Sequence, residues 1–188
     1  SYSITTSDVD SGDSAAITCS CPSWITLTDN GDGTGSLAGT PTNDEVGDHS
    51  VTLTVTDGSS ETGTQTFTIT VANTNDAPTI SSTAVTSVNE DATYTYTVVG
   101  DDVDTGDTLT LQGTTVPSWL TFTAGTGVLT GIPTNDEVGS HSVTITVEDA
   151  AGATGTQTFT ITVANTNDAP TITSTAGTTV DEDSLYSY

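Results

Sequence analysis

The sequence predicts an all-β chain built from tandem antiparallel sandwiches, and three observations support this fold class. First, apolar residues alternate with Thr or Ser in several segments, most clearly in Phe159–Val163, Val143–Val147 and Tyr94–Val98. A period of two places the apolar side chains on one face of a half-buried strand. Second, Gly, Asp and Pro separate these short segments, and third, a long stretch of sequence occurs twice. Short strands between turns, repeated along a chain, indicate a series of sandwiches.

The internal repeat defines the predicted domains. The segment Gly63–Pro78 returns without change as Gly155–Pro170, 92 residues later. We therefore expect a first repeat that lacks its first strand, a complete second repeat, and the first strands of a third, with further copies on either side. The expected boundaries are 1–75, 76–168 and 169–188.

A complete repeat is expected to hold seven antiparallel strands. In the second repeat the alternation places them near residues 79–88, 93–99, 108–112, 118–123, 127–131, 141–147 and 156–163. Trp24 and Trp119 are expected to fill the two cores. Because successive connections in an antiparallel sandwich alternate between its two ends, the loops are expected to gather where one repeat meets the next.

The chain carries 25 acidic residues and no Lys or Arg, which gives a net charge of -25. Nucleic acid is excluded as a partner, because binding phosphates requires cationic side chains. No apolar run is long enough to cross a membrane, so no membrane insertion is expected of this segment. The counter-charge must come from solution, and carboxylate and amide oxygens are the ligands that Ca²⁺ prefers.

Strand order places many of these oxygens near one linker. Some of these oxygens come from the loop that carries Asp44, at the end where the chain leaves the first repeat. Others come from the linker, and the rest come from the loops of the second repeat that carry Asp102 and Asp149. Such residues also make good turns, but turn chemistry alone does not explain why three acidic clusters face one linker. The candidate ligands at this junction are Asp44, Glu45, Asn73, Asn75, Asp76, Asp102, Asp104 and Asp149.

The arrangement resembles cadherin repeats, and more closely the dystroglycan-type, cadherin-like and Ig-like repeats found in arrays in bacterial surface proteins. The linker Asn73-Thr-Asn-Asp-Ala-Pro78 is similar to the cadherin linker, and Asp102-Val-Asp104 and Glu90 match further cadherin elements. The resemblance implies an Ig/cadherin-like sandwich and calcium ligation by Asn75, Asp76, Glu90, Asp102, Asp104 and their repeats. With the repeats of the other junction residues, the candidates extend to Asp8, Asp10, Asp136, Glu137, Asn165, Asn167 and Asp168.

Other motifs indicate no chemistry. Asp29-Asn-Gly-Asp-Gly33 begins like an EF-hand loop, but the twelfth position is Thr40 where a bidentate Glu is required, so we interpret it as a hairpin turn. His49 and His141 occupy equivalent positions and are expected to be packed or at the surface. Cys19 and Cys21 lie on one face of a strand, as a local staple or as two packed thiols. Without a nucleophile motif or any oxyanion-stabilising cation, catalysis is not expected.

The leading hypothesis for function is structural: a calcium-rigidified segment of an extracellular, cell-surface stalk, adhesin shaft or fibre. Its expected partners are adjacent repeats, neighbouring copies in a fibre, or a cell-surface protein or glycan. Two alternatives stay open. One is a carbohydrate-binding accessory module of a secreted protein, which requires an exposed aromatic platform. The other is a filament subunit that donates the strand at 169–188 to a neighbouring copy.

Overall fold

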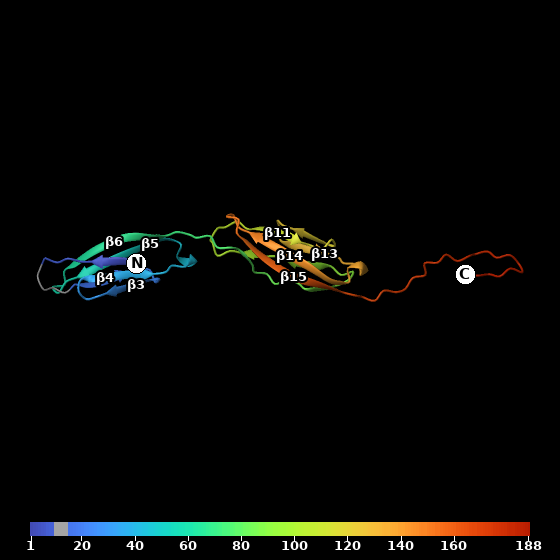
Figure 1. Ribbon diagram of the computed structural model, residues 1–188, viewed down its shortest axis with the longest axis horizontal. Coiled ribbons are helices and arrows are strands. Elements are labelled where there is room, and N and C mark those ends of the chain that lie inside the picture. Colours follow the sequence, from blue (N-terminus) through green and yellow to red (C-terminus); the bar gives the residue numbers. More distant parts are fainter. Residues whose placement is uncertain (10–14) are drawn as a thin grey trace. The chain divides into compact units, whose positions relative to one another are not determined.

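The computed structural model describes residues 1–9 and 15–188, and the chain divides into two compact units (Figure 1). Strands are the main regular structure of the described residues, with two short 3-10 helices, η1 (Asn43–Glu45) and η2 (Asn135–Glu137). None of the described helices has the length and apolar character needed to cross a membrane. Unit 1 comprises Ser1–Thr79, Gly100–Thr110 and Val147–Gly155, and unit 2 comprises Ile80–Val99, Leu111–Thr146 and Thr156–Tyr188.

Unit 1 contains a sandwich of two three-stranded sheets, with strand orders β1-β4-β3 and β2-β5-β6. The registers described for both sheets are antiparallel. Alternation turns Ile4, Leu37 and Val51 into the space between the sheets, where they are buried with Ile17 and Leu53. The bounds are β1 (Tyr2–Thr5), β2 (Ala16–Ser20), β3 (Ile25–Asp29), β4 (Thr34–Gly39), β5 (Gly47–Thr56) and β6 (Thr62–Val71).

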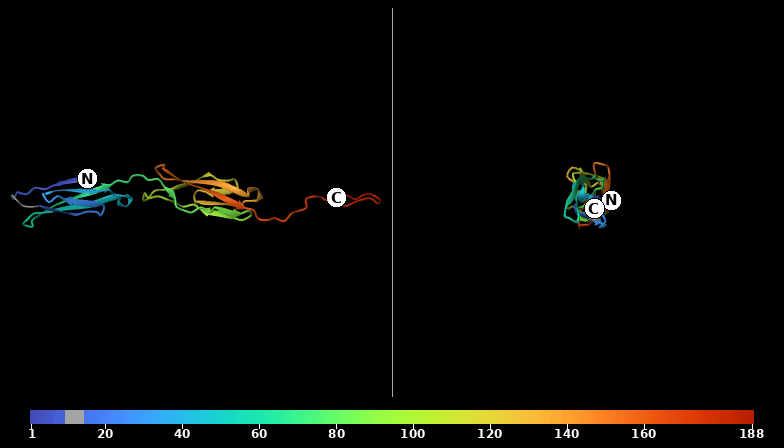
Figure 2. Two further views of the ribbon diagram at one scale, coloured as in Figure 1. Left: turned by 60° about the horizontal axis from the view of Figure 1, so that its bottom comes forward. Right: turned by 90° about the vertical axis from the view of Figure 1, so that its left-hand side faces the viewer.

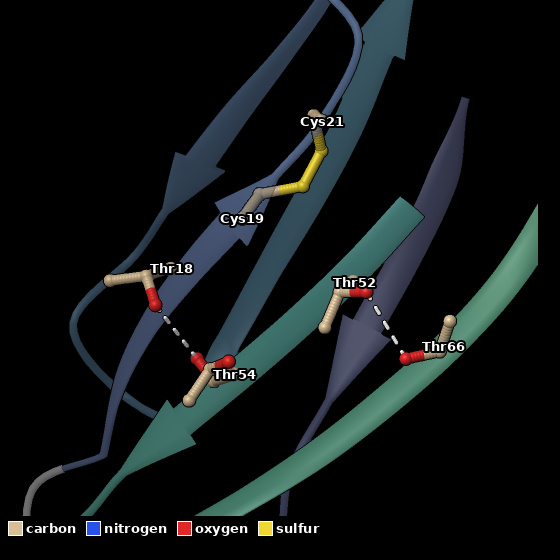
Figure 3. Close-up of a disulfide and its surroundings, with 6 residues drawn as sticks. All are labelled: Thr18, Cys19, Cys21, Thr52, Thr54 and Thr66. Atoms are coloured by element: carbon tan, nitrogen blue, oxygen red, sulfur yellow. Dashed lines mark hydrogen bonds between the residues drawn. A yellow bond between two sulfur atoms is a disulfide. The ribbon is translucent and has the colours of Figure 1, made fainter. Parts of the chain in front are cut away.

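Threonine covers the outer face of the sheet β2-β5-β6 (Figure 3). The hydroxyls of Thr52 and Thr66 lie 3.1 Å apart on neighbouring strands, and Thr18 Oγ1 donates to the carbonyl of Thr54 at 3.3 Å. A β-branched side chain favours the extended backbone, and its hydroxyl stays hydrated. Cys19 and Cys21 form a disulfide with 5.4 Å between their Cα atoms, and both pack against the core.

Unit 2 contains a second sandwich, with sheet orders β12-β13-β9 and β11-β14-β15-β8. Its core centres on Tyr94, Leu129, Val143, Ile145 and Ile161, each no more than 1 % exposed. A two-stranded sheet pairs β10 (Gly100–Asp101) with β7 (Thr79–Ile80). The remaining bounds are β8 (Ser87–Asn89), β9 (Tyr94–Thr97), β11 (Thr110–Thr115), β12 (Leu120–Thr123), β13 (Val128–Gly131), β14 (Gly139–Glu148) and β15 (Thr154–Ala164). Tandem all-β sandwiches, as predicted, are thereby confirmed.

The first strand of the second repeat differs from the prediction. A single antiparallel strand was expected at residues 79–88, but this segment forms two short strands, β7 and β8, in different sheets. β8 runs parallel to β15, with Val88 opposite Val163. Between the two strands, two backbone carbonyls accept hydrogen bonds from side chains. Tyr94 Oη donates to Val85 O at 2.7 Å, and Gln157 Nε2 donates to Ser82 O at 2.8 Å. These bonds supply donors to two of the carbonyls that the crossing takes out of the sheets.

The two tryptophans border the cores and do not fill their centres. Trp24 and Trp119 are both half-buried, and each meets a histidine ring edge-on, His49 and His141 respectively, at 5.7 Å between ring centroids. His49 Nε2 lies 2.6 Å from Glu45 O, and His141 repeats this contact with Glu137 O. Because a carbonyl oxygen only accepts, Nε2 carries the hydrogen in both rings. The histidines are packed, as expected.

The Tyr94 hydroxyl yields a test of the strand crossing. Burial raises the pKa of Tyr94 to about 12. An unfolded tyrosine titrates near 10. The Tyr94 contribution to stability is therefore fully present below about pH 10 and is lost as pH rises through about 12. We expect Tyr94→Phe to lower the free energy of unfolding by about 1 kcal/mol at neutral pH and to remove the highest-pH step from a tyrosine absorbance titration.

The matched control for this variant is Tyr186→Phe. Tyr186 Oη donates to Gly177 O at 2.6 Å, which is the same bond in an exposed segment. This control is expected to leave the stability of the sandwiches unchanged. Equal stability of Tyr94→Phe and wild type in urea denaturation would contradict the role given to the hydroxyl.

Candidate metal-binding site

Four carboxylates gather in two loops of unit 1. Asp102, Asp104 and Asp107 belong to the loop after β10, and Asp149 follows β14. One oxygen from each of Asp102, Asp107 and Asp149 lies within 4.8 Å of the others. Asp107 is absent from the predicted ligands. The signal that identifies it is its place as the third acid of Asp102-x-Asp104-x-x-Asp107 in a single loop.

Local turns hold these carboxylates in place. Asp102 Oδ1 accepts from Asp104 N at 2.9 Å, and Asp107 N donates to Asp104 O at 3.3 Å. Asp149 Oδ1 accepts from Ala153 N at 2.8 Å across a turn that passes through Gly152 at a φ of 89°. A positive φ at this point suits glycine, which has no Cβ to clash.

The linker that follows β6 is tied to the same carboxylates by two hydrogen bonds. Asn75 Nδ2 donates to Asp149 Oδ2 at 2.9 Å, and Asp76 N donates to Asp104 Oδ2 at 2.7 Å. A third hydrogen bond joins the linker to the loop that carries η1, because Asn43 Nδ2 donates to Asp76 Oδ2 at 2.8 Å. Each partner is a neutral amide, so none of these bonds offsets the charge of the acids.

Burial and mutual repulsion make this cluster electrostatically unfavourable by itself. Asp104 and Asp149 are each only 5 % exposed. Buried oxygens on two of the acids, Asp102 Oδ2 and Asp104 Oδ1, have no hydrogen-bond partner. Desolvation, followed by repulsion from Asp102, Asp149 and Asp104, raises the pKa of Asp107. The Asn75 amide, in contrast, lowers the pKa of Asp149.

The two acids of the loop that carries η1, Asp44 and Glu45, are not part of this carboxylate cluster. Asp44 is exposed, and Glu45 closes a capping box on η1, where its Oε2 accepts from both the backbone N and the hydroxyl of Thr42, each at 2.7 Å. These bonds lower the pKa of Glu45. Asp136 and Glu137 repeat the arrangement around Thr134. A capping role gives Glu45 and Glu137 a structural reason independent of metal.

Unit 2 carries a buried acid, Glu90, and an asparagine–aspartate contact like that of unit 1. Glu90 is 2 % exposed, its Oε1 accepts from Thr166 N, and its Oε2 is buried without a partner. Asn135 Nδ2 donates to Asp168 Oδ2 at 2.6 Å, as Asn43 does to Asp76. The sequence did not lead us to predict these two asparagine–aspartate hydrogen bonds, although Asn43 and Asn135 stand at the same place in both copies.

The other predicted ligands are not gathered with these acids. Asn73, Asn165 and Asn167 are exposed in the linkers, and Asp8 is exposed before β2. Asp10 lies outside the described residues. The loop Asp29–Gly33 joins the paired strands β3 and β4 as a hairpin turn, as predicted. Asp29 accepts from Ile17 N and Gly31 N, and these bonds lower its pKa.

The donor set of Asp102, Asp107 and Asp149, with Asp104 in the same loop, fits a hard divalent cation. It consists of oxygens alone, several of them carboxylate, and Ca²⁺ takes six to eight such ligands. The chain has no Lys or Arg to compensate them. A buried carboxylate oxygen without a partner is costly, and a bound cation removes that cost.

Comparison with known proteins places the fold. A protein-family model described as "Putative Ig domain" matches residues 1–72 and 77–164. Among solved structures, four extracellular cadherin domains of protocadherin gamma B7 match 91 % of this chain and 47 % of theirs, at 22 % identity and a TM-score of 0.54. The first three cadherin domains of mouse clustered PcdhgC3 match 79 % and 55 %, at 20 % identity and a TM-score of 0.50.

A different protein is more similar in sequence over a short part of its length. The endo-fucoidan hydrolase MfFcnA4 from glycoside hydrolase family 107 is 32 % identical over 83 % of this chain and 24 % of its own, with a TM-score of 0.43. The chain thus spans about a quarter of the hydrolase and about half of the two protocadherin structures. A search of curated proteins finds no significant match. The family model covers most of the chain in two copies, so the chain belongs to the family described as "Putative Ig domain".

Proposed function

We propose that this chain is a structural, calcium-rigidified repeat segment of an extracellular stalk, adhesin shaft or fibre. Ig-like and cadherin-like domains are typically extracellular, which agrees with this role. The repeats have the form of spacer modules, since the same linker sequence follows each of them. The proposal assigns no catalytic role to the segment.

One observation supports the proposal: oxygens of Asp102, Asp107 and Asp149 lie within 4.8 Å of one another, and buried oxygens of Asp102 and of Asp104 in the same loop have no hydrogen-bond donor. These residues would hold the cation, and Glu90 would contribute to a second site in unit 2. Bound calcium would supply positive charge and oxygen coordination. The chain's own residues do the remaining work, because Asn75 and Asp76 join the linker to the acids through an amide and a backbone N–H.

Calcium at this site would stiffen the linker between the repeats. Without a cation, repulsion among the four acids opposes the close approach of the loops that carry them. With the charge neutralised, the two hydrogen bonds from the linker are retained and the linker loses conformational freedom. A linker fixed in this way turns a flexible connection into a stiff one, which is the property that a stalk or shaft requires.

The carbohydrate-module alternative is less well supported. Stacking on sugars requires exposed aromatic faces, and both tryptophans are half-buried with a ring edge against a histidine. The similarity to a fucoidan hydrolase covers only about a quarter of that enzyme, and the two structures superpose poorly, with a TM-score of 0.43.

Calcium is expected to stabilise the chain. Binding to the folded state alone adds about 2.7 kcal/mol to the free energy of unfolding when free calcium is about a hundred times Kd. Calorimetric titration and thermal unfolding in calcium and in chelator measure this effect. A melting temperature that does not change between excess chelator and millimolar calcium would refute the proposal.

A pair of substitutions locates the site. Asp104→Asn keeps an acceptor for Asp76 N but removes a charge, and it should lower calcium affinity at least about tenfold, the usual scale for losing one ligand interaction of about 1.4 kcal/mol. Asp101→Asn removes the same charge from the exposed neighbouring residue and should leave the affinity nearly unchanged. Equal affinities for the two variants would place the ion elsewhere.

Asp107→Asn should have opposite effects in the two conditions. In chelator it removes repulsion from Asp102, Asp149 and Asp104, so the melting temperature should rise above that of the wild type. In saturating calcium it removes a ligand, so the gain in melting temperature caused by calcium should shrink. A decrease in chelator would contradict the electrostatic account of the cluster.

A further inference from the structure

The linker residue Asp76 makes two contacts with two different groups. Its backbone N donates to Asp104 Oδ2 at 2.7 Å, and its side-chain Oδ2 accepts from Asn43 Nδ2 at 2.8 Å. The Asp76 side chain is exposed, and it is not among the acids whose oxygens converge in the described part of the chain. The carboxylate of Asp76 is therefore bound by the loop that carries η1, while its backbone is bound by a buried acid.

Strand register explains why Asn43 and Asp76 meet. The turn η1 comes just before β5, and the linker comes just after β6. Because β5 and β6 are antiparallel, Gly47 at the start of β5 lies opposite Val71 at the end of β6 (Figure 2). The turn and the linker therefore leave the sheet at the same end of unit 1.

Asn43 stands on a turn that is fixed at several points. Glu45 Oε2 accepts from the backbone N and the hydroxyl of Thr42, each at 2.7 Å, which closes the capping box. Val46 N donates to Asn43 O at 3.2 Å, and His49 Nε2 donates to Glu45 O at 2.6 Å. The side-chain amide of Asn43 is thus presented to the linker from a rigid support.

The same contact returns in the second copy of the sequence. Asn135 Nδ2 donates to Asp168 Oδ2 at 2.6 Å, and η2 has the capping box and the histidine contact of η1. Asn135 stands 92 residues after Asn43, and Asp168 stands 92 residues after Asp76. The asparagine–aspartate bond is therefore a property of the repeat.

Hydrogen-bond satisfaction separates the roles of Asp76 and Asp104. Asp76 Oδ2 has a neutral amide donor, and a hydrogen bond to an ionised acceptor is a strong one. Asp104 is 5 % exposed, and its Oδ1 is buried with no partner. The oxygen that lacks a positive partner thus belongs to Asp104, and the oxygen of Asp76 that faces Asn43 already has a donor.

We infer that Asp76 is a positioning residue and not a ligand of the proposed cation, and that Asn43 sets its position. Asn43 fixes the Asp76 side chain, and this holds the Asp76 N–H against Asp104 Oδ2 and leaves Asp104 Oδ1 for the ion. The inference rests on the proposed function, because it concerns how the cation site is prepared. It replaces the ligand role that the resemblance to cadherin repeats implied for Asp76.

The contact would act on calcium affinity through the freedom of the linker. A segment that is held in its bound conformation beforehand loses less entropy on binding. Without the Asn43 amide, the Asp76 side chain loses its donor, and the linker must be ordered when the ion binds. Calcium affinity then falls although every oxygen ligand is still present.

Calorimetric titration of the full chain with calcium separates a positioning residue from a ligand. Asp76→Asn keeps an oxygen that can accept from Asn43 and keeps the backbone N–H, so the affinity should stay close to that of the wild type. Asn43→Ala and Asp76→Ala each remove the contact and should weaken binding about tenfold. The double variant should bind no more weakly than either single variant, because all three lack the same contact.

A ligand role would give different results. Asp76→Asn would then remove charge from the ion and weaken binding as much as Asp104→Asn does. Asn43→Ala would leave the affinity unchanged, or raise it by freeing the Asp76 carboxylate for the ion. Either result would overturn the inference.

Hydrogen exchange of the Asp76 amide in chelator tests the contact without calcium. This N–H is protected while the linker is docked on Asp104, so Asn43→Ala should speed its exchange. Asn135→Ala makes the same change in the second copy and should leave the exchange at Asp76 unchanged. Equal exchange at Asp76 in Asn43→Ala and wild type would overturn the inference. A chain that binds no calcium would refute the proposed function, and the exchange rate would still decide whether Asn43 positions the linker.

Discussion

The absence of any fixed positive side chain is the constraint on which the rest of this structure depends. With 25 acids and no Lys or Arg, no ion pair between side chains is available except through histidine, and both histidines are engaged with a carbonyl and a tryptophan. The cores contain aliphatic and aromatic residues, threonine lies on the outer faces, and the described acids lie in loops, in linkers and at exposed strand positions such as Asp48. Where acids are buried, as at Asp104, Asp149 and Glu90, backbone N–H groups and asparagine amides satisfy part of each carboxylate. What is left unsatisfied defines the candidate metal site.

Satisfaction of polar groups also explains how the sandwiches close. The first strand of the second repeat crosses from one sheet to the other, and the carbonyls exposed by that crossing accept hydrogen bonds from Tyr94, Tyr96 and Gln157. The same aromatic side chains fill the core, so one set of residues provides apolar burial and hydrogen bonding together. The crossing places β8 parallel to β15 and covers an edge that would otherwise be open.

The sequence by itself determined the fold class, most strand positions and the chemistry of the candidate ligands, because these depend on local periodicity and composition. Alternation of Thr with Val or Ile identifies a half-buried strand wherever it lies, and the return of Gly63–Pro78 at Gly155 identifies the repeat. Tertiary structure decided which acids converge. It added Asp107 to the group, placed Glu45 and Glu137 in capping boxes, and divided the strand expected at 79–88 between two sheets. These outcomes depend on the three-dimensional path of loops and on carbonyls satisfied by residues up to 75 positions away, and no local pattern encodes such contacts.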